Sequence, residues 1–89
     1  MLSSERMVFA MKENIIDALE KLRASVKDID INIKMIDAVL SSINMSIDEL
    51  PMGLQERIMT LIKQRQELIC HRIEGLRLIK LTEELISGE

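Results

Sequence analysis

Apolar residues in the first half of the chain recur at spacings that alternate between four and three residues. This alternation keeps successive apolar side chains on one face of an α-helix and is typical of a coiled-coil heptad repeat. We therefore expect a first long helix over about residues 4–44 that packs along its length against another helix. The interaction core that the repeat predicts consists of Ile15, Leu19, Leu22, Val26, Ile29, Ile33, Ile36, Leu40 and Ile43.

The repeat is followed by a segment with strong turn signals. Pro51 and Gly53 form the only cluster of proline and glycine in the chain, and Ser46 with Glu49 has the spacing of a helix capping box. Proline disfavours helical geometry at the residue before it and suits the first turn of a new helix. We therefore predict a turn over about residues 45–52.

A second helix is predicted over about residues 53–86, ending before Gly88. Two long helices joined by a short linker form an antiparallel hairpin. The predicted fold is thus all-α, with coiled-coil-like packing in a single domain of residues 1–89. Residues 1–14 either overhang the hairpin or form a separate short helix.

One broad arc of the second helix is apolar and contains Leu54, Ile58, Leu61, Ile62, Leu68, Ile69, Ile73, Leu76 and Ile79.

The apolar surface of the first helix is wider than one neighbouring helix requires. Met11, Ile16, Ala18 and Val39 flank the heptad positions, and such a wide stripe indicates contact with more than one neighbour. A chain of 89 residues has a marginal core of its own, and association is a common remedy. We expect a homodimer that forms a four-helix bundle, with a heterologous helical protein as the alternative partner.

Two arginines, Arg65 and Arg72, fall near the middle of the apolar arc of the second helix. A guanidinium group in apolar surroundings needs a carboxylate or access to water. Reflection of the chain about Pro51 places residues opposite each other when their numbers total about 102, and this relation pairs Asp30 with Arg72 and Asp37 with Arg65. We predict two partly desolvated salt bridges that help to set the register of the hairpin.

An apolar cluster lies near the N-terminus, where the hairpin leaves the first helix uncovered. It consists of Met7, Val8, Phe9 and Met11, and methionine-rich surfaces adapt to varied partners. This cluster is a candidate partner surface. It is also consistent with packing against a second subunit or with a third helix that folds back.

Composition narrows the chemistry that the chain can perform. Cys70 is the only cysteine, and the adjacent His71 diverges from it on a helix, so we expect no cysteine metal cluster and no nucleophile–base pair. We predict a structural role for Cys70, no cofactor, no metal and no catalytic residues.

The net charge of −3 argues against nucleic acid as the general partner. A lone thiol, no long apolar run and no signal-like N-terminus favour the cytoplasm.

These features favour a non-catalytic protein–protein interaction module, such as a small adaptor, chaperone or regulator that binds a helical partner. A DNA-associated regulator is an alternative, although only the segment from Lys63 to Lys80 is locally basic.

A second alternative is a small helical-bundle enzyme. The stretch from Leu19 to Arg23, followed by Asp28, Ile29 and Asp30, resembles the opening of helical chorismate mutases. The resemblance implies a dimeric bundle whose cationic side chains clamp a dicarboxylate, with Arg23 as the first of them. After Arg23 the first helix supplies Lys27 and Lys34 but no second arginine.

Overall fold

The computed structural model describes residues 2–87 of the chain, with side chains from residue 5 onward. Two helices make up nearly all of it: α1 spans Leu2–Ser41 and α2 spans Met52–Ser87. A short 3-10 helix, η1, spans Ile47–Glu49 in the connection between them. No strand occurs within residues 2–87. The prediction of an all-α chain with two long helices is confirmed.

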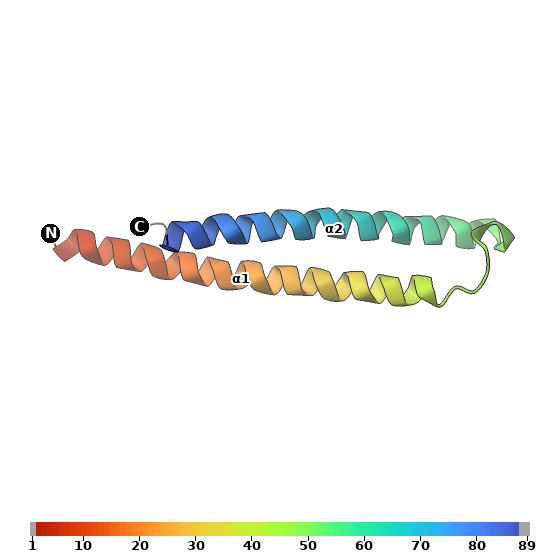
Figure 1. Ribbon diagram of the computed structural model, residues 1–89, viewed down its shortest axis with the longest axis horizontal. Helices are drawn as coiled ribbons and strands as arrows, with labels where there is room; N and C mark the ends of the chain where they lie inside the picture. The colour runs from red at the N-terminus through yellow and green to blue at the C-terminus, as the bar shows by residue number, and fades with distance from the viewer. Residues whose placement is uncertain (1, 88–89) are drawn as a thin grey trace.

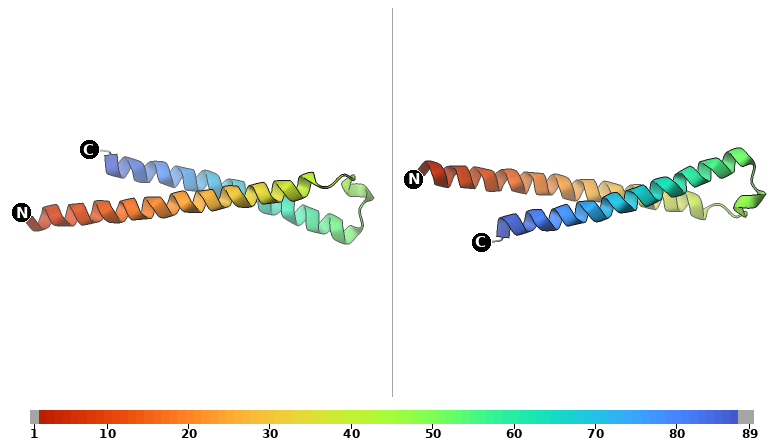
Figure 2. Two further views of the ribbon diagram at one scale, coloured as in Figure 1. Left: turned by 90° about the horizontal axis from the view of Figure 1, so that it is seen from below. Right: turned by 90° about the horizontal axis from the view of Figure 1, so that it is seen from above.

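The two helices run antiparallel and lie side by side along most of their length (Figure 1). The molecule is a rod of 72 × 17 × 15 Å with a radius of gyration of 20.4 Å. A compact chain of this length would have a radius of gyration of about 12 Å. The N-terminal part of α1 runs past the C-terminal end of α2 in all three views (Figures 1 and 2). Residues 2–14 therefore continue α1 as an overhang rather than folding back.

The side chains that α1 turns toward α2 are those of the predicted repeat. Leu19 and Val26 are buried, and the other members of the predicted interaction core are half-buried. Leu19 and Val26 form a small cluster with Ile79 of α2, and Leu22 and Ile86 pack against it. Ile58 is buried separately, nearer the turn. The core is thus a line of contacts between two helices.

The broad apolar arc predicted for α2 is divided by the structure. Ile58 and Ile79 are buried, whereas Leu54, Ile73 and Leu76 are exposed. The arc therefore does not face α1 as a whole, because one neighbouring helix covers only a narrow stripe of its partner.

The connection differs in detail from its prediction. α1 ends at Ser41, earlier than expected, where the hydroxyl groups of Ser41 and Ser42 donate to the carbonyl oxygens of Ala38 and Val39 at 3.1 and 2.6 Å. Serine side chains that bond to nearby carbonyl groups in this way compete with helix continuation. The predicted capping box is also wrong, because the Ser46 side chain makes no capping hydrogen bond.

Pro51 precedes the first residue of α2, as its chemistry favours. Its carbonyl oxygen accepts hydrogen bonds from the backbone N–H groups of Leu54 and Gln55, both at 3.0 Å. The Gln55 side chain also donates to the carbonyl oxygen of Leu50 at 2.8 Å. These bonds anchor the start of α2 to the end of the connection.

Gly75 lies where α2 packs tightly against Val26 of α1. A β-carbon at this position would lie 2.8 Å from Cγ2 of Val26, which is too close for either atom to stay in place. Because Val26 is buried and its short branched side chain has little freedom, the absence of a side chain at Gly75 allows the two helices to meet here.

Within the described residues, neither α1 nor α2 contains an apolar stretch that could cross a bilayer.

We predict that Gly75→Ala lowers the stability of the hairpin. Alanine favours a helix by about 1 kcal/mol over glycine, but overpacking a well-packed contact typically costs about 1–3 kcal/mol, and here it would force Val26 or α2 to move. Gly53→Ala is the matched control, because a β-carbon there meets nothing within 4 Å. Urea denaturation at one protein concentration measures both variants. A Gly75→Ala protein more stable than the wild type would contradict the close contact.

Candidate interaction surface

The two predicted ion pairs lie on one long edge of the hairpin. Nε of Arg65 donates to Oδ1 of Asp37 at 2.5 Å, and its Nη2 lies 3.5 Å from Oδ2 of the same carboxylate. Nε of Arg72 donates to Oδ1 of Asp30 at 2.5 Å. The structure therefore brings together each arginine and the aspartate that the reflection about Pro51 assigns to it.

Solvent reaches both pairs. The side chains of Arg65 and Asp37 are 36% and 48% exposed, and those of Arg72 and Asp30 are 42% and 39% exposed. The hydrogen bond that Arg65 donates to Asp37, together with the negative charge of that carboxylate, raises the pKa of Arg65 above its ordinary value. We predicted partly desolvated pairs because both arginines lie on the apolar arc, and the observed pairs are more exposed than that prediction implies. A seam between two helices has an open edge through which a long side chain reaches water.

A third ion pair on this edge was not predicted. Nη2 of Arg23 lies 3.7 Å from Oε1 of Glu83, and both side chains are about half exposed. Reflection about Pro51 places Arg23 opposite Ile79, one helical turn from Glu83, so a search limited to directly opposed residues misses it. A search that allowed one turn of offset would have found the pair.

The candidate partner surface near the N-terminus is open to solvent. Met7 is 72% exposed and Phe9 is 64% exposed, and Val8 and Met11 are also exposed. These residues lie on the part of α1 that overhangs α2 (Figure 1). The structure thus leaves the whole cluster without a neighbour from α2.

An apolar groove of about 500 Å³ lies at the turn end of the hairpin. It forms where α1 has ended and α2 continues, and its lining includes Val39, Ile43, Met45, Leu54, Ile58 and Leu61. Both ends of the rod therefore present apolar side chains that the hairpin does not cover.

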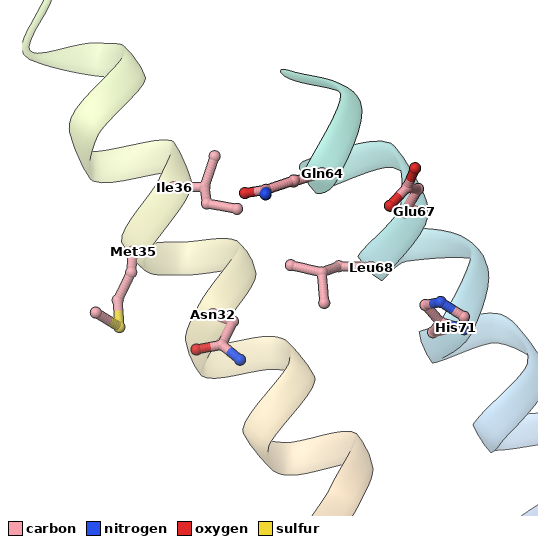
Figure 3. Close-up of a pocket in the computed structure, with 7 residues that line it drawn as sticks. All are labelled: Asn32, Met35, Ile36, Gln64, Glu67, Leu68 and His71. Atoms are coloured by element: carbon pink, nitrogen blue, oxygen red, sulfur yellow. The ribbon is translucent and has the colours of Figure 1, made fainter. Parts of the chain in front are cut away.

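A second groove, of about 460 Å³, lies between the helices at mid-length and is more polar. Ile36 and Leu68 extend into the gap from opposite helices (Figure 3). Asn32 of α1 and Gln64 of α2 lie beside them, and His71 lies farther along α2. This arrangement mixes amide, imidazole and aliphatic groups without concentrating charge.

No group of three or more His, Cys, Asp or Glu side chains in the described part of the chain could hold a metal ion. Cys70 is exposed in the hairpin, and the structural role predicted for it stays a prediction. Arg23, the residue that resembles the first chorismate mutase cation, lies beside the carboxylate of Glu83.

Comparison with known proteins gives no relative: the chain matches no family model, no curated protein sequence and no solved structure.

We predict that the Asp30–Arg72 pair contributes only modestly to stability. Exposed pairs are typically worth about 0.2–1 kcal/mol, and salt screens them. A double-mutant cycle with Asp30→Ala and Arg72→Ala, followed by urea denaturation, should give a favourable coupling in that range that shrinks in 1 M NaCl (about a 3 Å screening length).

The matched control is the cycle of Asp28→Ala with Arg72→Ala, because Asp28 is exposed on the same helix as Asp30 and forms no salt bridge with Arg72 in the described hairpin. Equal couplings in the two cycles would show that the Asp30 contact has no specific role in register.

Proposed function

We propose that this chain is a non-catalytic helical interaction module that completes its core by packing against another helical protein, with a second copy of itself as the first partner to test. One observation carries this proposal. Within the described residues only Leu19, Val26, Ile58 and Ile79 are buried, and no side chain is less than 2% exposed. Large aliphatic side chains meanwhile remain exposed along both helices.

The hydrophobic effect favours association of such a hairpin with further helices. Burial of apolar surface contributes roughly 25 cal/mol per Å², and contiguous exposed apolar surface in a folded protein marks an interaction site. A hairpin with a one-line core lacks the burial that normally balances the entropy of ordering the chain. Association with further helices supplies that burial. The uncovered Met7–Met11 segment and the apolar groove at the turn end support the same proposal.

The possible biological roles of such a module include a small adaptor, a chaperone and a regulator of a helical protein, and the single cysteine favours a reducing compartment such as the cytoplasm. The DNA-associated alternative has less support, since two of the basic side chains in the locally basic segment, Arg65 and Arg72, are already paired with aspartates. The enzyme alternative rests on Arg23, which already has Glu83 as a neighbour.

Sedimentation equilibrium at micromolar protein concentration tests the first partner. The expected result is a mass twice the 10.2 kDa of one chain, with dissociation on dilution. A mass of 10.2 kDa across the whole range would refute self-association and leave a different helical protein as the partner to seek.

A further inference from the structure

α2 carries a second apolar stripe beside the one that faces α1. Its positions alternate between spacings of three and four residues, as in a coiled-coil seam. Met59 and Ile73 are 56% and 60% exposed, and Leu76 is also exposed, whereas Ile62 and Ile69 are half-buried. We call this the lateral stripe; its members are Met59, Ile62, Gln66, Ile69, Ile73 and Leu76.

The lateral stripe is more continuously apolar than the face of α2 that meets α1. That inner face includes Arg65, Arg72, Gly75 and Thr82, all half-buried. Each member of the lateral stripe follows an inner-face residue by one position, which rotates it by roughly 100° around the helix. Helices in a four-helix bundle pack against two neighbours at roughly this angle. The lateral stripe is therefore placed to contact a further helix.

The pattern of the lateral stripe is close to a palindrome. Reflection about the midpoint between residues 67 and 68 exchanges Met59 with Leu76 and Ile62 with Ile73. Gln66 exchanges with Ile69, next to the midpoint. When two copies of α2 run antiparallel, the lateral stripe of one copy therefore faces the lateral stripe of the other. This is the self-complementarity that a twofold interface requires. Gln66 from each copy lies near the axis, where a polar residue in an apolar seam helps to fix register.

Charges along one edge of the lateral stripe select the same register. Glu56 and Arg77 lie on this edge and are exposed, and neither makes a salt bridge within the described chain. In the palindromic register, Glu56 of each copy lies beside Arg77 of the other, which gives two attractive pairs. A shift of one heptad in one direction would instead bring Glu56 beside Glu84 and Lys63 beside Arg77. A shift in the other direction would bring the two copies of Lys63 together.

We propose that two hairpins associate through the lateral stripe, α2 against α2 and antiparallel, with the twofold axis passing between Gln66 and Ile69. This proposal rests on the self-association proposed above and names its surface and register. The apolar members of the stripe provide the contact, the reciprocal Glu56–Arg77 pairs favour this register, and like-charge contacts disfavour the shifted registers.

Two exposed isoleucines test the surface. Ile73→Asp places a carboxylate in the lateral stripe, whereas Ile31→Asp places one on the outer side of α1, where Ile31 is 47% exposed. Both variants should keep their helical circular dichroism at high concentration. Sedimentation equilibrium should show that Ile73→Asp weakens dimerisation at least tenfold and that Ile31→Asp leaves it unchanged. A dimer that survives Ile73→Asp would overturn the proposed surface while the self-association itself stands.

A charge swap tests the register. Glu56→Arg and Arg77→Glu each turn two attractive contacts into repulsive ones, so each single variant should dimerise roughly fivefold more weakly or worse. The double variant restores both pairs and should dimerise as the wild type does. The two residues lie six turns apart on one helix, roughly 30 Å, so rescue requires contact between copies. Absence of rescue in a protein that still dimerises would overturn the antiparallel register. A monomeric wild type would instead refute the underlying self-association.

Discussion

Two helices joined by one turn can bury only a single stripe of each helix, and this constraint governs the rest of the structure. The molecule is a rod 72 Å long and about as wide as two helices, so every residue lies close to solvent. Its core is a line in which Leu19, Val26 and Ile79 cluster and Ile58 lies apart. A wider apolar surface on either helix then has no place to be buried within one hairpin.

The same constraint explains how polar groups can lie in the seam. Arg65 and Arg72 occupy inner positions of α2, yet each reaches an aspartate at the open edge and stays partly hydrated. Gly75 lies one turn along from Arg72, where α2 packs tightly against Val26. These contacts share one register, with the paired residue numbers totalling close to 102. The close contact at Gly75 tolerates no side chain, and together with the two charge pairs it defines one alignment of the helices. Aliphatic side chains alone are compatible with more than one alignment.

Much of this arrangement could be predicted from the sequence, because the heptad spacing and one Pro–Gly break determine both the helices and their alignment. The Asp30–Arg72 and Asp37–Arg65 contacts followed from that reflection alone. Other features depend on local competition that spacing does not express: α1 ends early where Ser41 and Ser42 bond to its own carbonyl groups, and Ser46 does not cap. The conformation of residues 2–14 could not be predicted from the sequence, because their apolar pattern fits an overhang as well as a folded-back helix.

The lateral stripe was hidden in the sequence for a physical reason. Ile73 and Leu76 belong to the same broad apolar arc as Ile79, and a helical wheel cannot show which part of a wide arc the neighbouring helix covers. The structure separates the two parts by exposure, since Ile79 is buried and Ile73 is open to solvent. In the dimer that we propose, this wide arc makes two contacts, one within the hairpin and one with the second copy.

The central claim is that the hairpin depends on a further helix for its stability, and the concentration dependence of thermal unfolding tests this most directly. Circular dichroism melts across a dilution series of the wild-type chain should show a midpoint that falls as the protein is diluted, because folding and association are coupled. A cooperative melt whose midpoint stays constant over a thousandfold dilution would show that the isolated hairpin is sufficient and would contradict the account.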